Sequence, residues 1–128
     1  MKLKRDKYDA TFSDYIRYRD GLKCRRCGAQ FPKLTQGIHC AHIYSRGNKA
    51  IRLDPDNAIS LCNGCHRHFT KRTLEFHDWL EGQFGKEQMD FLKAKYYQTR
   101  KITREEKDAQ RAVFQTEIAG YRERLAKL

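Results

Sequence analysis

The chain has 128 residues, of which 39% are apolar and 12% aromatic, and it carries 27 Lys and Arg against 16 Asp and Glu. This length accommodates one domain with a modest hydrophobic core. The net charge of +11 favours a polyanionic partner. A charged start and the lack of an 18-residue apolar run argue against a signal peptide and a transmembrane helix, so we expect a cytoplasmic protein without membrane contact.

The positive charge is concentrated in the middle of the chain. Residues 24–72 carry nine basic and two acidic groups, whereas residues 1–23 carry seven and four, and residues 73–128 carry eleven and ten. A generically basic surface would spread the excess evenly. We therefore predict a functional core at 24–72, preceded by a helical lead-in at 1–23 and followed by a helical extension at 73–128.

The lead-in is predicted to hold one short helix before the first cysteine pair. The stretch Tyr8–Asp20 is rich in Tyr, Phe and charged residues. Its Thr11, Ser13 and Asp14 are candidate helix caps.

The core segment is predicted to contain turns, two short strands and a late helix. Gly37–Tyr44 has the residue types of a strand, and Asp54-Pro55-Asp56-Asn57 is a turn signal. A second strand over Ala58–Cys62 and a helix after Cys65 would follow that turn.

The last third of the chain is predicted to be helical. Candidate helices cover Leu74–Phe84, which Gly82 or Gly85 would end, and Lys86–Gln98. Thr103-Arg-Glu-Glu106 has the form of a capping box, so a third helix is expected to start there. An apolar seam on that helix either packs on the protein's own body or forms a homodimer contact. The seam consists of Phe114, Ile118, Tyr121, Leu125 and Leu128.

Two Cys-x-x-Cys pairs provide four metal ligands. Cys24 and Cys27 form the first pair, and Cys62 and Cys65 form the second. In a chain without a secretion signal, paired cysteines are typical of metal binding rather than of disulfides. Four thiolates at this spacing predict a structural Zn²⁺. Cys40 is left over and is expected to be a packed thiol.

The residues between these pairs resemble the HNH endonuclease family of the ββα-metal type, and more narrowly the phage recombination proteins of the NinG type. The resemblance covers about residues 24–70. The matching residues are Cys40-Ala41-His42-Ile43, Arg46, Arg52-x-Asp54-x-x-Asn57 and Leu61-Cys62-x-x-Cys65-His66. It implies an α+β fold with a small ββα-metal (HNH, or His-Me finger) core stapled by a four-cysteine zinc site, flanked by helical additions.

The resemblance also implies a role for each polar residue of the motif. His42 would be the general base that activates water, and His66 would hold a catalytic divalent ion, either Mg²⁺ or Mn²⁺ or Ni²⁺. Asn57 would fix the backbone and orientation of His42, or ligate the ion as in some family members. The residues alone allow other interpretations: His66 could be a neighbour of the zinc site or a surface residue, and the turn sequence by itself explains Asn57.

One position departs from the family pattern. Many members carry Asp, Glu or His immediately before the base, as a second metal ligand, whereas this chain has Ala41. His39 lies two residues earlier on the same strand face and could replace that ligand, or it could face solvent. With Ala41 at this position, the resemblance leaves open which residue is the second protein ligand of the catalytic ion.

Arginine placement fits a phosphate substrate. Arg46 and Arg52 flank the expected turn and could clamp a phosphate or stabilise the transition state, and each could also be a solvated loop charge. Further basic residues lie beside the cysteine pairs, where they would contact a DNA backbone. These are Arg25, Arg26, Arg67, Lys71 and Arg72.

The leading hypothesis is a metal-dependent DNA endonuclease of phage or prophage recombination or DNA processing. Because Ala41 cannot bind metal, a zinc-dependent nucleic-acid-binding module without catalysis is the alternative. A cytotoxic nuclease is a third hypothesis, but it would usually need a delivery domain and an immunity partner.

Overall fold

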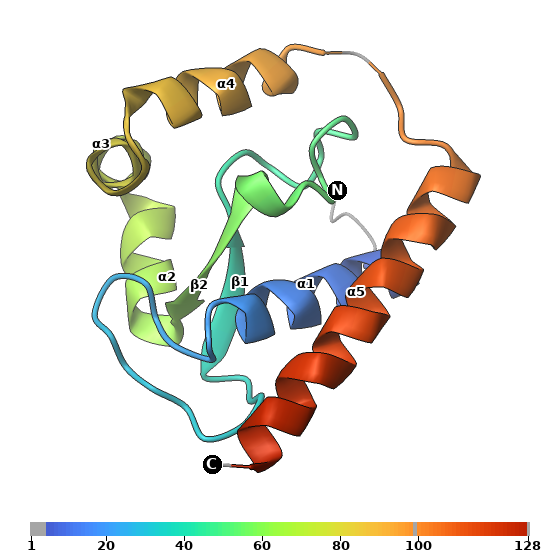
Figure 1. Cartoon of the computed structure of the whole chain (residues 1–128). Coiled ribbons are helices and arrows are strands. Elements are labelled where there is room, and N and C mark those ends of the chain that lie inside the picture. The colour runs from blue at the N-terminus through green and yellow to red at the C-terminus, as the bar shows by residue number, and fades with distance from the viewer. Residues whose placement is uncertain (1–4, 99, 128) are drawn as a thin grey trace.

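The computed structural model describes residues 5–98 and 100–127, and it confirms the α+β fold class. A two-stranded antiparallel hairpin consists of β1 (Ile38–His42) and β2 (Ala58–Cys62). Figure 1 shows this hairpin at the centre, with α1 and α5 on one side and α2 and α3 on the other. The helices are α1 (Lys7–Arg19), α2 (Asn63–Lys71), α3 (Thr73–Phe84), α4 (Lys86–Tyr96) and α5 (Arg104–Ala126), and a 3₁₀ turn, η1, covers Pro55–Asn57.

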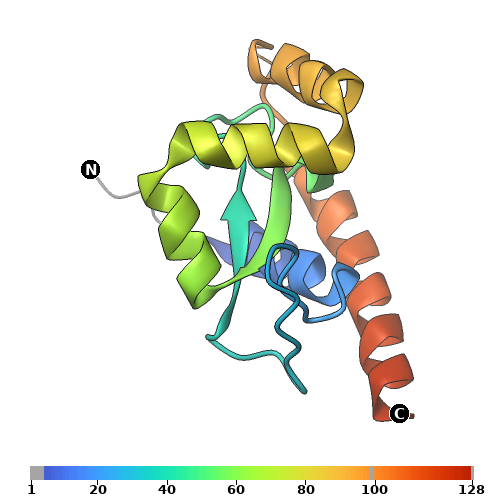
Figure 2. The same cartoon turned by 90° about the vertical axis from the view of Figure 1, so that its left-hand side faces the viewer.

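The hairpin is buried between two helical layers. His42 pairs with Ala58 at one end of the ladder, and Ile38 pairs with Cys62 at the other. The first four residues of β2 are at most 2% exposed, because α1 covers one face and α2 covers the other (Figure 2). A two-stranded hairpin is marginal in water, so these helices are needed for its stability.

Helix α1 also satisfies the backbone of β2. The guanidinium of Arg19 donates to the carbonyl oxygens of Pro55 and Ala58, at 2.8 and 2.9 Å. The carboxylate of Asp20 accepts from the N–H of Ser60 at 2.8 Å. The outer edge of β2 is therefore partly blocked by Arg19 at the end of α1 and by Asp20, the residue that caps it.

The structure corrects the predicted start of α1. The helix begins at Lys7, and its cap is a reciprocal capping box between Asp6 and Asp9. The expected caps Thr11, Ser13 and Asp14 all lie inside the helix, so that prediction was wrong. An aspartate at the third helical position takes the place of the longer acid that is usual in this motif.

Several other boundaries follow the sequence closely. Strand β2 has the predicted bounds, and Thr103 caps α5 through the predicted capping box with Glu106. Helix α3 ends at Phe84, before Gly85 with φ of +88°. Helix α2 begins earlier than expected, because the sulfur of Cys62 accepts from the N–H of Cys65 and caps it.

The apolar seam of α5 packs on the protein's own body at Phe114. This side chain is 6% exposed and belongs to a second core cluster with Phe12, Ile16, Leu53 and Ala58. Its ring stacks on Tyr15 with centroids 4.3 Å apart. Leu128, the last residue of the predicted seam, lies outside the described residues. The homodimer contact stays a prediction.

No helix among residues 5–98 and 100–127 is both long and apolar enough to cross a membrane.

The packing of α5 yields a stability prediction. Phe114→Ala should lower the free energy of unfolding by about 3–5 kcal/mol, because it leaves a cavity between α5 and α1. Val113 is 56% exposed on the same helix turn, so Val113→Ala should change it by less than about 0.5 kcal/mol. Urea unfolding of both variants measures the difference. Equal effects would show that α5 does not depend on this contact.

Candidate functional site

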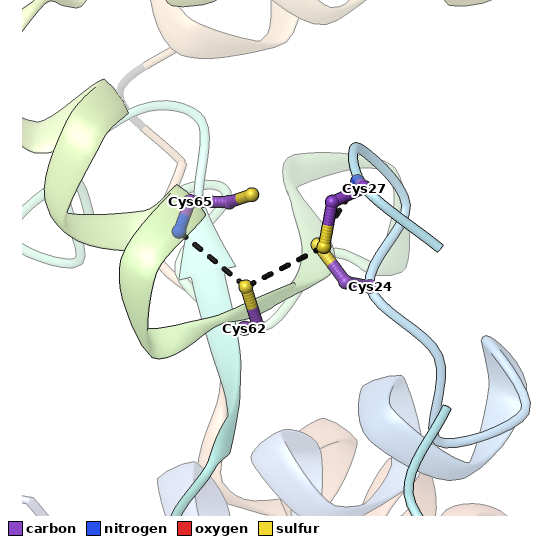
Figure 3. A group of neighbouring side chains, drawn as sticks. All are labelled: Cys24, Cys27, Cys62 and Cys65. Carbon is purple, nitrogen blue, oxygen red and sulfur yellow. Dashed lines mark hydrogen bonds between the residues drawn. The ribbon is translucent and has the colours of Figure 1, made fainter. Parts of the chain in front are cut away.

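Four cysteines converge where the first loop meets the start of α2. The sulfur atoms of Cys24, Cys27, Cys62 and Cys65 all lie within 4.8 Å of one another (Figure 3). Those of Cys27 and Cys62 are 3.7 Å apart. Two sulfur ligands of a tetrahedral ion with bonds of ~2.3 Å would be about 3.8 Å apart. The cluster therefore has the dimensions of a metal site.

Local backbone geometry presents each pair of sulfurs. The N–H of Cys27 points at the sulfur of Cys24, and the N–H of Cys65 points at that of Cys62, both at 3.5 Å. Gly28 follows the first pair with φ of +79°, and its N–H donates to the carbonyl of Cys24 at 3.0 Å. Only glycine adopts this left-handed turn without strain, so Gly28 closes the first knuckle.

The protein alone does not favour four thiolates at once. Burial, joined by neighbouring sulfurs, raises the pKa of Cys65 to about 12. Burial opposes ionisation of Cys24 as well, but backbone N–H donors overcome it and lower the pKa of that thiol to about 6. A bound cation would be required to hold all four in the ionised form.

A pair of histidines spans the junction between β1 and α2. The Nδ1 atoms of His39 and His66 are 2.9 Å apart. The Nε2 atom of His39 lies 2.8 Å from the carbonyl oxygen of Gln36. A carbonyl only accepts, so neutral His39 carries its proton on Nε2, and its Nδ1 accepts a hydrogen bond from the Nδ1–H of His66. Burial, followed by the nearby His39 and His42, lowers the pKa of His66.

His42 ends β1 with its ring held on two sides. Its Nε2 atom lies 3.0 Å from the carbonyl oxygen of Arg52, and its ring lies 5.5 Å from that of Phe12. The proton of neutral His42 is thereby fixed on Nε2, which leaves Nδ1 as the basic atom. Burial lowers the pKa of His42, and Arg46 adds to this, whereas the Arg52 carbonyl and Asp9 oppose it.

The three histidines line two adjoining hollows. The first, the histidine-pair hollow, contains His39 and His66, and the second, the His42 hollow, contains His42 and Arg46. Both are also lined by Arg5, Ser13 and Cys40. Among the described residues, no direct contact joins the rings of His42 and His66. The two hollows adjoin because Arg5, Ser13 and Cys40 line both of them.

Asn57 is fully buried and bonds only to the backbone. Its side-chain oxygen accepts from the N–H of Tyr44 at 2.8 Å, and its amide nitrogen donates to the carbonyls of Tyr44 and Ile51 at 3.0 and 3.2 Å. Its own carbonyl accepts from the N–H of Ile43 at 2.8 Å. Asn57 thus clamps both ends of the loop that follows His42.

The guanidinium of Arg52 is held by two acids of the N-terminal segment. It bonds to both carboxylate oxygens of Asp9, at 2.7 Å through Nε, and lies 3.3 Å from Asp6. Burial alone would raise the pKa of Asp9, but Arg52 and the N–H of Asp6 hold it at about 2. The side chain predicted to bind phosphate is therefore engaged in an internal ion pair.

The other predicted basic residues lie around α2 and the cysteine cluster. Arg25 pairs with Asp20 at 3.2 Å, and Arg26 bonds to the sulfur of Cys65 at 3.6 Å. Arg72 lies 3.9 Å from Glu75 at the end of α2, and Arg67 and Lys71 are exposed on the same helix. Three of these five side chains therefore have partners within the protein, and Arg67 and Lys71 face solvent.

Sequence reasoning missed the contribution of the N-terminal segment and α1 to the site. Arg5 and Ser13 line both hollows, and Asp9 lines that of His42. None of them belongs to a local motif with the histidines. The one signal in the sequence is the acidic pair Asp6 and Asp9, which could have been matched to Arg52 of the core loop.

A hairpin that leads directly into a helix, with histidines at the junction and a cysteine cluster beside it, is the arrangement that the resemblance to HNH proteins implies. The sequence model of the family described as "Bacteriophage Lambda NinG protein" matches residues 3–123. The chain belongs to this family.

One curated relative supports the same class. A protein of Lactococcus phage SK1 named "Probable HNH endonuclease" is 37% identical over 65 residues. The match covers 49% of this chain and 66% of the relative, just under two thirds of its length. No solved structure matches the chain.

The cysteine cluster gives a prediction about metal content. The purified protein should retain a sulfur-bound divalent ion, and Cys27→Ser should lose it, because three thiolates bind more weakly than four. Elemental analysis after dialysis, with melting followed by circular dichroism, measures both effects. Cys40→Ser is the matched control and should keep the ion, since its thiol lies outside the cluster. Unchanged metal content and melting in Cys27→Ser would contradict the assignment.

Proposed function

We propose that this protein is a metal-dependent DNA endonuclease that hydrolyses phosphodiester bonds with His42 as general base. It would act in phage or prophage DNA recombination or processing, in the cytoplasm of the bacterial host. The observation that carries the proposal is the placement of His42 and the His39–His66 pair in adjoining hollows with a shared arginine, Arg5. Membership of the family and the name of the phage relative support it.

The surroundings of His42 suit a general base. Its Nε2–H is directed to the Arg52 carbonyl, so Nδ1 is the atom that would take a proton from water. Phe12 limits rotation of the ring. Burial keeps the imidazole neutral near pH 7, which is the state that accepts a proton.

The histidine pair fits a divalent ion. Two ligands at ~2.1 Å in adjacent octahedral positions are about 3.0 Å apart, and the two Nδ1 atoms are 2.9 Å apart, so the ion would replace the proton that they share. The Gln36 carbonyl accepts from the Nε2–H of His39 and orients its ring, as backbone carbonyls do behind many metal-binding histidines. When bound, the ion would stabilise negative charge on the phosphate and the leaving oxygen. Imidazole ligands favour Mn²⁺ or Ni²⁺, and a mostly hydrated Mg²⁺ would also fit.

Two arginines would hold the scissile phosphate beside the base. Arg5 and Arg46 both line the His42 hollow. Guanidinium groups bind phosphate oxygens through two parallel hydrogen bonds, which would position the phosphorus atom for attack. Arg52 would act differently, by fixing the carbonyl that orients His42.

The cysteine cluster would hold a structural Zn²⁺. Four thiolates in a closed tetrahedral site are typical of zinc, and none of them is left for a substrate. Arg25, Arg26, Arg67, Lys71 and Arg72 beside it would contact the DNA backbone without reading sequence. A homodimer through α5 would let two such sites cut opposite strands.

The alternative function is a nucleic-acid-binding module without catalysis. Ala41 favours it, because this side chain is 1% exposed in the main core and offers no ligand. The position of His39 against His66 favours the enzyme, since it supplies a nitrogen ligand from the same strand.

Plasmid nicking with Mn²⁺ or Mg²⁺ tests the proposal. His42→Ala should lower the nicking rate by at least about 100-fold, the usual contribution of a general base. His68→Ala is the control and should nick like the wild type, because His68 bonds to Glu75 outside both hollows. Nicking that persists in His42→Ala would refute the mechanism. DNA binding without cutting under any divalent ion would favour the alternative.

The pH dependence of nicking tests the state of His42. The pKa of His42 is lowered from 6.5, so the neutral base dominates at pH 7. The acid limb of the pH profile of kcat/KM should therefore have its midpoint below pH 6.5. Because Arg46 contributes to the lowering, Arg46→Gln should move the midpoint to higher pH. Arg67→Gln, on the exposed surface of α2, should leave it in place. A wild-type midpoint above pH 7 would exclude a buried His42 as the base.

A further inference from the structure

Three tyrosines form a row of contacting rings that ends at the surface. The rings of Tyr44 and Tyr96 are stacked, with centroids 4.6 Å apart and planes at 29°. Tyr97 meets Tyr96 edge to face at 5.1 Å. Tyr97 is 70% exposed, and Tyr96 is 36% exposed. We call Tyr44, Tyr96 and Tyr97 the tyrosine ladder.

The backbone under each ring is fixed. Asn57 bonds to both the N–H and the carbonyl of Tyr44. The side chain of Asn48 donates to the carbonyl of Tyr96 at 2.9 Å, which ties the end of α4 to the loop after β1. The N–H of Tyr97 donates to the carbonyl of Lys93 at 3.3 Å. The exposed ring therefore rests on a preorganised support, which reduces the entropic cost of placing a ligand on it.

The first residue of the ladder is close in sequence to the catalytic residues proposed above. Tyr44 follows His42 by two residues, and Arg46 follows Tyr44 by two. Two residues span at most about 7 Å, so the backbone of Tyr44 is near that of both residues, while its ring packs on His77 of α3 and Tyr96 of α4. Lys49 in the same loop and Lys93 on α4 are exposed cations that suit a phosphate backbone.

We propose that the tyrosine ladder is a stacking platform for an unpaired nucleobase of the DNA substrate, with Tyr97 as its contact face. The inference rests on the proposed function, because it takes DNA as the ligand. An aromatic ring stacks on the face of any base, but in a duplex neighbouring base pairs cover both faces. The ladder thus favours DNA with single-stranded or unstacked nucleotides over a fully stacked duplex.

Fluorescence anisotropy tests the platform without cleavage. A labelled single strand of about 12 nucleotides and its duplex are titrated with protein that keeps its own metal, without added Mg²⁺ or Mn²⁺. Tyr97→Ala should weaken binding of the single strand about tenfold and leave duplex binding unchanged, because stacking is lost while phosphate contacts remain. Tyr97→Phe keeps the ring and should bind like the wild type.

Leu74→Ala is the matched surface control, since Leu74 is 84% exposed on α3 and should affect neither DNA. An equal loss on both DNAs, or no loss in Tyr97→Ala, would overturn the platform. Two results separate it from the proposed function. If nicking depends on His42 while Tyr97→Ala binds single strands normally, only the platform fails. If the wild type never nicks while the loss in Tyr97→Ala is confined to single strands, the platform stands and the nuclease proposal fails.

Discussion

The side chain of Asn57 organises the loop on which the candidate site depends. Buried in η1 just before β2, its side chain bonds to the backbone of Tyr44 and Ile51, and its own carbonyl accepts from the N–H of Ile43. These bonds fix the segment that carries Arg46 and the Arg52 carbonyl. A buried amide with all its partners in place is costly to disturb, because each backbone group left unpaired would lose its hydrogen bond without access to water.

The cysteine cluster and the histidine pair are connected through the first turn of α2. His66 follows Cys65 directly, on the first turn of α2, so an ion that fixes the second cysteine pair also fixes the ring facing His39. The two-stranded hairpin has too little surface of its own to place that helix. A structural ion would thus set the geometry of the histidines without touching a substrate.

Local patterns in the sequence predicted the cysteine pairs, the bounds of β2 and the capping box at Thr103, because each depends on residues a few positions apart. The role of α1 could not be read in this way. Arg52 fits a phosphate clamp in the motif, yet its partner is Asp9, 43 positions away. Arg5, just before α1, and Ser13, within it, reach the hollows because α1 packs against β1, and no local periodicity encodes that packing.

Helix α1 also gives the His42 hollow its balance of charge. The carboxylate of Asp9 neutralises the guanidinium of Arg52 and holds that side chain in place. The backbone carbonyl of the same residue orients the imidazole of His42. Arg46 and burial favour the neutral ring, while Asp9 opposes them more weakly. A base that stays unprotonated beside guanidinium groups can accept a proton while those groups attract phosphate. The N-terminal helix, which resembles a mere lead-in in the sequence, is therefore a wall of the site.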